Sequence, residues 1–277
     1  MLLLVGDFHL FPMALVYDDL MTSTDGSQFL EDCKRIATAA GRLILTHHPH
    51  DVATQRKTDG SPVTRADEEA DALITQALEV LTPDIPIVSE EGRFAQHGAY
   101  ERFWLVDPLD GTESYKRGEP EFTVNIALID HGAPVLGVIY DPSHHQLYWA
   151  AAGQGAWRDD GAGAVRIHTR SIAAGMPLRL IKSRRKPSAG FLQKIAALQV
   201  EQMQLVSSSI KFCRVAEGSA DLYPRFGSTM EWDTAAGHAI LNEAGGRVLI
   251  AGSQNELTYG KPGYNNPHFM AWGISSL

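Results

Sequence analysis

The spacing of apolar residues changes along the chain, and this change constrains the fold more than any other feature. From residue 29 onward apolar side chains recur every three or four residues, and the same spacing returns at residues 66–78. It predicts two helices with one apolar face each, the first ending at the His-His-Pro-His segment 47–50 and the second covering residues 67–81. After Pro83 apolar and polar residues alternate in short runs, which is typical of strands. These runs cover residues 85–88, 103–106, 122–129, 135–140 and 146–151, with a hairpin turn at His131 and Gly132.

The second part of the chain has a different order of elements. Beyond about residue 166 the predicted strands and helices alternate, with helices at 189–198, 208–217 and 233–244 and a strand at 247–250. This alternation is typical of an α/β lobe, whereas the elements before it are typical of an α+β lobe. The length of 277 residues allows two such lobes. We therefore expect a poorly ordered extension at residues 1–27, an α+β lobe at 28–165 and an α/β lobe at 166–277.

Charge and cysteine content exclude several classes of partner. The chain carries 24 Lys and Arg against 33 Asp and Glu, a formal net charge of −9. A nucleic-acid polymer is therefore not an expected partner, because phosphate backbones are bound by concentrated Lys and Arg. Cys33 and Cys213 lie far apart, which leaves no disulfide framework and no paired-cysteine site. No apolar run is long enough to cross a bilayer. We expect a cytoplasmic protein without a transmembrane segment, a peripheral position at the inner membrane being an alternative, and the oligomeric state stays open.

The most informative segment is Asp-Pro-Leu-Asp-Gly-Thr at residues 107–112. A predicted strand leads into a tight turn that carries two carboxylates three residues apart. The proline restricts the backbone and the glycine relieves the turn, so Asp107, Asp110 and the carbonyl of Leu109 can point the same way. Convergent hard oxygens of this kind suit Mg²⁺. The amides of Gly111 and Thr112 would face the same space and could hold a phosphoryl oxygen.

The segment has three alternative interpretations. An isolated Asp-x-x-Asp-Gly is most often a surface turn. An EF-hand loop requires an oxygen ligand at its third position, where this chain has Leu109. Phosphatases with an aspartyl nucleophile carry only one residue between the two acids. The last two patterns do not match, so a surface turn and a metal site are the alternatives that remain.

Two further acidic segments favour the metal site. Glu90 follows the strand predicted just upstream, and Asp233 opens a predicted apolar helix. Each has an ordinary explanation, since Glu90 could lie on a solvated edge and Asp233 could cap its helix. Together with the turn at 107–112 they form a plausible set of ligands for two divalent metal ions.

These segments together resemble a known family. Ser-Glu-Glu at residues 89–91, Asp-Pro-Leu-Asp-Gly-Thr at 107–112 and Trp-Asp-Thr-Ala-Ala-Gly-His at 232–238 closely resemble the signature segments of the lithium-sensitive, magnesium-dependent inositol monophosphatase superfamily. Within it the chain is similar to the bacterial 3′(2′),5′-bisphosphate nucleotidases, over about residues 29–269. The resemblance implies a layered αβαβα sandwich of the inositol monophosphatase and fructose-1,6-bisphosphatase type.

The resemblance also implies a ligand set and catalytic residues. Two or three Mg²⁺ ions would be held by Glu90, Asp107, the Leu109 carbonyl, Asp110 and Asp233. Asp67 and Thr112 match family positions that orient the attacking water together with Glu90. The alternative for Asp67 is an acid in the first turn of a helix, where the helix dipole favours negative charge.

The substrate branch depends on cations that could meet a second phosphate. Ser208, Lys211 and Arg225 lie in segments that resemble those of nucleotidases, and the alternative is a solvated lysine and an ion-paired arginine. Ser208 and Lys211 share one face of a predicted helix start. The substrate would contact the following residues: Glu90, Leu109, Asp110, Gly111, Thr112, Ser208, Lys211, Arg225 and Asp233.

One segment departs from the nucleotidase pattern. Where many of these enzymes carry a Ser-Arg-Ser-His-like segment, this chain has a basic run at residues 182–186. Such a run is most often solvated, although it could also supply charge to a polyphosphorylated ligand. The base-binding residues therefore stay unassigned. The histidines at 47, 48, 50, 144 and 145 are interpreted as surface residues.

Three hypotheses about function follow. The first is a Mg²⁺-dependent phosphatase that removes the 3′-phosphate of adenosine 3′,5′-bisphosphate, a small nucleotide bisphosphate, to give AMP, and that also acts on 3′-phosphoadenylyl sulfate. The second is an inositol or sugar monophosphatase of the same superfamily. The third is a non-catalytic regulator that binds a metal or a nucleotide on the same fold.

Overall fold

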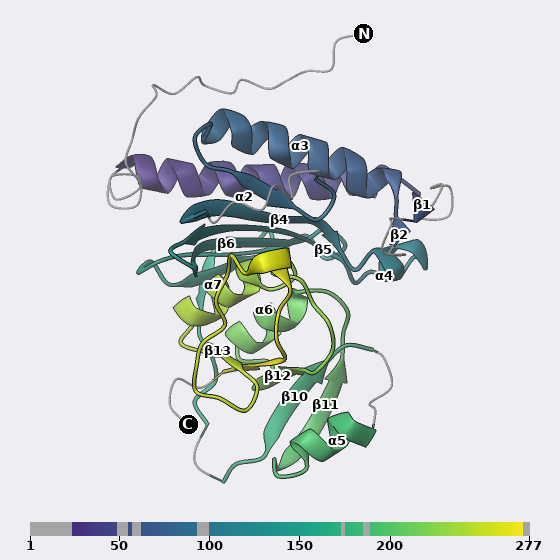
Figure 1. Ribbon diagram of the computed structural model, residues 1–277, viewed down its shortest axis with the longest axis vertical. Helices are drawn as coiled ribbons and strands as arrows, with labels where there is room; N and C mark the ends of the chain where they lie inside the picture. The colour runs from purple at the N-terminus through teal and green to yellow at the C-terminus, as the bar shows by residue number, and fades with distance from the viewer. Residues whose placement is uncertain are drawn as a thin grey trace.

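The computed structural model describes residues 24–48, 55–56, 62–92, 100–172, 175–184 and 189–273. They form five layers, in the order helices, sheet, helices, sheet and helix (Figure 1). The layered αβαβα sandwich expected from the sequence is therefore confirmed. The expected extension at 1–27 lies outside the described residues except for its last four, with which the first helix begins.

The first layer consists of two long helices that lie side by side. They are α2 (Thr24–Leu45) and α3 (Arg65–Leu81). Their apolar faces are buried against the first sheet, as the periodicity predicts, and Ala40 and Ile74 are fully inaccessible to solvent. The helix α3 begins at Arg65, two residues earlier than predicted, because Thr64 and Asp67 form a capping box at its start.

The second layer is a seven-stranded sheet in the order β3-β4-β5-β6-β7-β8-β9. Its strands are β3 (Ile87–Ser89), β4 (Arg102–Asp110), β5 (Thr123–Asp130), β6 (Ala133–Asp141), β7 (Gln146–Ala151), β8 (Ala156–Asp159) and β9 (Val165–Ile167). Within this sheet β3 and β4 pair in parallel, and all other neighbouring strands pair antiparallel. The hairpin turn between β5 and β6 is confirmed, with positive φ at both His131 and Gly132. The short strands β1 (Gln55–Arg56) and β2 (Pro62–Val63) pair separately.

Two strands of this sheet were not predicted. β8 and β9 lie within a stretch rich in glycine and charged residues, in which strand alternation is weak. β9 crosses the expected lobe boundary between residues 165 and 166, so the first sheet extends to Ile167. Pairing with β7 and β8 stabilises these strands, and this pairing is a tertiary contact that no local pattern encodes.

The third layer lies between the two sheets and consists of two short buried helices, α6 (Ile210–Ala216) and α7 (Ala235–Glu243). α7 packs on the inner face of the first sheet, most closely on β6. A side chain at Gly137 of β6 could not be accommodated, because its Cβ would lie 2.4 Å from the carbonyl oxygen of Ala236. Close packing of this kind brings the start of α7 to the end of the first sheet.

The second sheet has five strands in the order β11-β10-β12-β14-β13. They are β10 (Leu178–Lys182), β11 (Val200–Leu205), β12 (Leu222–Arg225), β13 (Arg247–Ile250) and β14 (Phe269–Trp272). The predicted alternation of strands and helices is confirmed through β13, and β14 adds an antiparallel strand between β12 and β13. The helix α5 (Ala189–Ile195) forms the outer layer, and the 3₁₀ turn η1 (Pro262–Tyr264) precedes β14.

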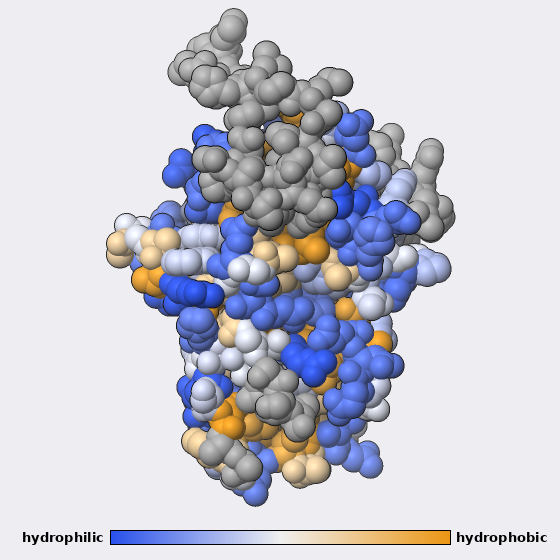
Figure 2. Space-filling view, turned by 90° about the vertical axis from the view of Figure 1, so that its left-hand side faces the viewer, coloured by the Kyte–Doolittle hydropathy of each residue, from blue (hydrophilic) through white to orange (hydrophobic). Residues whose placement is uncertain are grey.

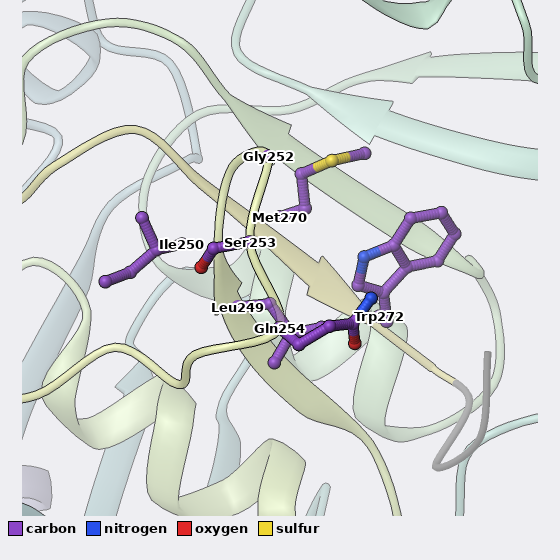
Figure 3. A pocket seen from close by; sticks show the side chains of 7 residues that line it. All are labelled: Leu249, Ile250, Gly252, Ser253, Gln254, Met270 and Trp272. Carbon is purple, nitrogen blue, oxygen red and sulfur yellow. The ribbon is translucent and has the colours of Figure 1, made fainter.

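The outer face of this second sheet carries an apolar cavity beside β13 and β14. Its volume is about 480 Å³, and it is lined by Leu249, Ile250, Gly252, Ser253, Gln254, Met270 and Trp272 (Figure 3). None of these residues is ionisable, so the cavity lacks groups for acid–base or metal chemistry. Elsewhere, the face shown in Figure 2 is mainly hydrophilic, with hydrophobic residues in separate patches. Within the described part of the chain, no helix combines the length and hydrophobicity needed to cross a membrane.

Candidate active site

The strand β4 places two carboxylates at the end of the first sheet. It continues through Asp107 to Asp110, instead of ending at residue 106 as predicted. Between these acids β4 has one residue more than β5, since Asp107 pairs with Asn125 and Asp110 with Thr123. Such a bulge re-aims side chains that regular alternation would send to opposite faces. The turn predicted from the sequence is thus a β-bulge within a strand.

Three carboxylates from separate elements meet at this point. Carboxylate oxygens of Glu90, Asp107 and Asp233 lie within 4.8 Å of one another. Glu90 directly follows β3, and its N–H donates to the carbonyl of Val106 at 3.0 Å, which ties it to β4. Asp233 comes from the second half of the chain and accepts the N–H of Met230 at 2.9 Å. Three of the acidic residues singled out in the sequence, Glu90, Asp107 and Asp233, are therefore brought together by the fold, and Asp110 is not in this group.

Asp233 does not open its helix, contrary to the sequence prediction. α7 begins at Ala235 with Thr234 as its N-cap residue, so Asp233 lies in the turn before it. Because a carboxylate in this turn is not needed to cap the helix, the interpretation of Asp233 as a simple cap is wrong. Its second oxygen can contribute to the acidic cluster.

Burial and mutual repulsion make this cluster electrostatically costly. Burial, joined by repulsion from Glu90, raises the pKa of Asp107 well above its usual range. Burial and the charge of Asp110 raise the pKa of Asp233 to about 8. Burial also raises the pKa of Asp110, although the charge of Lys211 opposes the shift. Buried carboxylates that repel one another are stabilised by a nearby cation and otherwise tend to bind protons.

The donor set fits magnesium. Carboxylates and a backbone carbonyl are hard oxygen ligands, which Mg²⁺ and Ca²⁺ prefer over softer nitrogen or sulfur sites. The side chain of Leu109 is buried in the core, while its carbonyl accepts a hydrogen bond from the Thr112 hydroxyl at 3.1 Å. A divalent ion in the cluster would also offset the repulsion that raises the pKa values. The residues present therefore suit a hard divalent cation.

Asp67 serves its helix and the candidate site at the same time. One oxygen, Oδ2, accepts the N–H of Thr64 at 2.8 Å and also the Thr64 hydroxyl, which caps α3. The other oxygen, Oδ1, accepts the hydroxyl of Thr112 at 3.1 Å. Burial raises the pKa of Asp67, and the bonds from Thr64 and Thr112 oppose this. The two interpretations of Asp67 from the sequence are thus compatible.

The predicted cations lie close enough to the acidic residues to interact with them electrostatically. Lys211 is only 4% exposed, so the alternative of a solvated lysine is wrong. Its ammonium donates to the carbonyl of Ser208 and lies 5.2 Å from the ring centre of Tyr223. Burial lowers the pKa of Lys211 to about 8, against the opposing charge of Asp110. The two charges are near enough to affect each other.

Arg225 ends β12 and is held by neutral partners. Nη1 lies 3.4 Å from the Ser183 hydroxyl, and Nη2 donates to the carbonyl of Ser228 at 2.7 Å. Its Nε is buried without a hydrogen-bond partner among the described residues. No carboxylate in the described ranges forms an ion pair with it, so the alternative of an ion-paired arginine is not supported.

The structure adds residues that the sequence did not reveal. Ser209 donates its backbone N–H to Asp110 and its hydroxyl to Oδ1 of Asn125, the latter at 2.6 Å. Glu121 binds Ser207 and Arg184, which belong to the second half of the chain. None of these lies in a segment with a metal-binding pattern. Only the spacing of Thr64 and Asp67 carried a sequence signal, that of a capping box.

The basic run and the histidines take several different places. Lys182 is buried, with its ammonium 5.6 Å from the ring centre of Phe191, so it is not part of a solvated face. Residues 185 and 186 of the run, like His50, lie outside the described residues. His47 and His144 pair with Glu69 and Asp141 respectively. Among the described residues, neither histidine belongs to a group of three potential metal ligands.

Comparisons with known proteins agree with this arrangement. Residues 25–273 match the inositol monophosphatase family. The 3′(2′),5′-bisphosphate nucleotidase CysQ of Escherichia coli K12 is 45% identical over 227 residues, which is 79% of this chain and 89% of that protein. CysQ of Haemophilus influenzae is 31% identical over 251 residues, covering 87% and 91% of the two chains.

Solved structures show the same similarity in three dimensions. CysQ from Bacteroides thetaiotaomicron superimposes with a TM-score of 0.76 at 35% identity, covering 93% of this chain and all of the other. An inositol monophosphatase from Thermotoga maritima gives 0.73 at 25% identity, covering 90% and 93%. With its sequence segments, its five layers and its acidic cluster in agreement, the chain belongs to the inositol monophosphatase family.

Proposed function

We propose that this protein is a magnesium-dependent 3′(2′),5′-bisphosphate nucleotidase that hydrolyses the 3′-phosphate of adenosine 3′,5′-bisphosphate to give AMP and phosphate. The observation that carries the proposal is the position of Lys211 and Arg225 next to the carboxylate cluster. Both cations interact electrostatically with Asp110 and Asp233. A metal site of this kind suits one phosphate, and adjacent cations suit a second.

The metal would be held by oxygen atoms of Glu90, Asp107, Leu109, Asp110 and Asp233. Two or three Mg²⁺ ions are proposed for this set. When bound, Mg²⁺ lowers the pKa of water and offsets negative charge on the phosphoryl group. The amides of Gly111 and Thr112 would bind phosphoryl oxygens beside it.

The side chains around the cluster would orient the attacking water. The Thr112 hydroxyl points its proton toward acceptor oxygens of Asp67 and Leu109, each 3.1 Å away. Its lone pairs are then left to accept a hydrogen bond from water. Glu90 offers a second acceptor from the other side of the cluster. Because two acceptors restrict the orientation of the water, they favour in-line attack on phosphorus.

The second phosphate would bind to Ser208, Lys211 and Arg225. The neutral partners of Arg225 support this assignment, since no carboxylate in the described ranges neutralises its charge. A 5′-phosphate would supply that negative charge. The 5′-phosphosulfate of 3′-phosphoadenylyl sulfate is also anionic and is proposed as a further substrate.

A comparison of three substrates tests the proposal. Phosphate release is measured with adenosine 3′,5′-bisphosphate, inositol 1-phosphate and fructose 1,6-bisphosphate, with Mg²⁺ and with chelator. We expect release only with Mg²⁺ and a kcat/KM at least about tenfold higher for the nucleotide, roughly 1.4 kcal/mol of transition-state binding. A preference for inositol phosphate would make the protein a monophosphatase. Absence of release from all three substrates would favour a non-catalytic regulator.

A further inference from the structure

We propose that Glu121 is a positioning residue for the second-phosphate subsite, and that it determines specificity for bisphosphates over monophosphates. Glu121 lies between α4 (Thr112–Lys116) and β5, on the first half of the chain. It touches no predicted metal ligand through its side chain. The inference rests on the proposed function, because it concerns how that subsite is held in place.

The carboxylate of Glu121 bridges two segments of the second half. Oε2 accepts the backbone N–H of Ser207 at 2.9 Å and Nε of Arg184 at 2.6 Å, and Oε1 accepts Nη2 of Arg184. Burial opposes ionisation, but the bonds from Arg184 and Ser207 outweigh it and lower the pKa of Glu121. The contact with Arg184 is therefore a charged, bidentate ion pair, which is stronger than a neutral hydrogen bond.

The backbone of Glu121 packs against Gly111, directly after the end of β4 that carries Asp110. A Cβ on Gly111 would lie 2.8 Å from the Glu121 carbonyl oxygen. Gly111 follows Asp110 directly and has a φ of 102°. Glu121 thus contacts the residue that follows β4 through its main chain and the second half of the chain through its side chain.

The segment that Glu121 holds leads directly to the predicted phosphate-binding residues. Ser207 is followed by Ser208, whose φ of 57° is uncommon for a residue other than glycine. A strained conformation of this kind persists only where neighbouring contacts enforce it. Lys211 comes three residues later, with its ammonium bonded back to the Ser208 carbonyl. Loss of the Ser207 contact would therefore loosen both predicted phosphate ligands.

Neutral hydrogen bonds support the same segment. The Ser114 hydroxyl donates to that of Ser207 at 2.9 Å, and Ser209 bonds to Thr123 and Asn125. These bonds keep the segment attached to the first sheet when the carboxylate of Glu121 is removed. A Glu121 variant is therefore expected to fold, with the segment less well placed.

Arg184 extends the bridge toward the third predicted ligand. Its neighbour Ser183 lies 3.4 Å from Nη1 of Arg225 through its hydroxyl. The carboxylate of Glu121 consequently fixes the segment that precedes Lys211 and the segment that contacts Arg225. Both segments carry or contact residues proposed for the second phosphate, and neither supplies a predicted metal ligand. Because Ser209 also bonds to Asp110, chemistry at the first phosphate should depend on Glu121, but less than binding of the second phosphate does.

Two substrates that differ in one phosphate test this inference. Adenosine 3′,5′-bisphosphate and adenosine 3′-monophosphate share the reacting group, and only the first carries the 5′-phosphate. For Glu121→Ala we expect kcat/KM to fall at least about tenfold for the bisphosphate, mainly through KM, and less than about threefold for the monophosphate. For Glu121→Gln we expect a kcat/KM between those of the wild type and Glu121→Ala. The amide oxygen of Gln can still accept the Ser207 N–H, but the negative charge that faces Arg184 is gone.

A remote ion pair supplies the matched control. Glu256 pairs with Arg247 at 3.0 Å on the exposed surface, so Glu256→Gln should leave both substrates unchanged. Equal losses on the two substrates in the Glu121 variants, or no loss at all, would overturn the positioning role. If the wild-type protein itself does not favour the bisphosphate over the monophosphate, the second-phosphate subsite and the proposed function fail together. Thermal unfolding of each variant shows whether a loss of activity comes from misfolding. If Glu121→Ala misfolds, the comparison of the two substrates is made with Glu121→Gln.

Discussion

The hydroxyl of Thr112 lies 3.1 Å from Oδ1 of Asp67, which joins the start of α4 to the start of α3. The other carboxylate oxygen of Asp67 is occupied by Thr64. The hydroxyl of Thr112 therefore has a fixed orientation before any substrate arrives.

Thr112→Val should lower kcat strongly while it keeps the shape of the side chain. Without the hydroxyl, the attacking water loses one acceptor, and a loss of about 10²-fold is expected. Thr112→Ser retains the hydroxyl and should keep most of the activity. Steady-state kinetics at saturating Mg²⁺ measure both. Similar kcat values for Thr112→Val and the wild type would exclude Thr112 from the reaction.

Mg²⁺ should stabilise the wild-type protein, and Asp107→Asn should abolish most of this effect. Asp107 is buried among other carboxylates, so its charge is unfavourable without a cation. At 100 times the dissociation constant, binding adds about 2.7 kcal/mol to the free energy of unfolding. In chelator, Asp107→Asn should be at least as stable as the wild type, since one repelling charge is gone.

Thermal unfolding with and without Mg²⁺ measures this difference. Asp160→Asn is the control, because Asp160 pairs with Arg158 on the exposed surface and should leave the Mg²⁺ response intact. An undiminished response in Asp107→Asn would place the metal elsewhere.

Arg225→Gln should reduce kcat/KM for adenosine 3′,5′-bisphosphate by about tenfold or more and spare the 3′-monophosphate. The reason is that Arg225 is proposed to contact only the second phosphate, and charge-assisted bonds contribute about 1.5–3 kcal/mol. Arg247→Gln, on the exposed surface, is the matched control. Equal losses on both substrates would argue that Arg225 supports the acidic cluster instead.

Gly111→Ala should cost both stability and activity, whereas Gly153→Ala should cost stability alone. Both glycines have positive φ, at 102° and 76°, so each substitution introduces strain of about 1–2 kcal/mol. Only at Gly111 would the new Cβ meet a backbone atom, the carbonyl oxygen of Glu121 at 2.8 Å. Relief of that contact must move the turn carrying Asp110. Chemical denaturation and kcat distinguish the two variants.

Asp221 should make the free energy of unfolding depend on pH below about pH 5. Burial works to raise its pKa, but hydrogen bonds from Arg170 and Arg179 outweigh burial and hold the pKa at about 2. Because this lies below the unfolded value of 3.8, the contribution is complete above about pH 5 and is lost as pH falls toward 2.

Asp221→Asn should lower the free energy of unfolding by about 3 kcal/mol at pH 7, since two arginines lose their buried partner. The difference between variant and wild type should shrink as pH falls below 4. Urea unfolding across this range measures it. A difference that does not change with pH would show that the charge of Asp221 is not the stabilising factor.

Local patterns predicted most of the elements that surround the site. The apolar faces of α2 and α3, the alternation in β5 and the hairpin at His131 and Gly132 follow from side-chain spacing and turn chemistry. Each depends on neighbours within a few residues. β8 and β9 escaped prediction because β8 is stabilised by pairing with β7 and β9 by pairing with β8, and such pairing is not visible in a local window.

The sequence by itself determined which residues could bind a metal and which elements would carry them, since charge, spacing and periodicity are local properties. The tertiary structure decided that these residues lie close together at one site. The bulge between Asp107 and Asp110 aims two carboxylates, and the packing of α7 on the first sheet brings Asp233 beside Glu90. The same packing places Glu121 against Ser207 and Arg184. Contacts between halves of the chain depend on strand order and layer packing, which no short segment of sequence encodes.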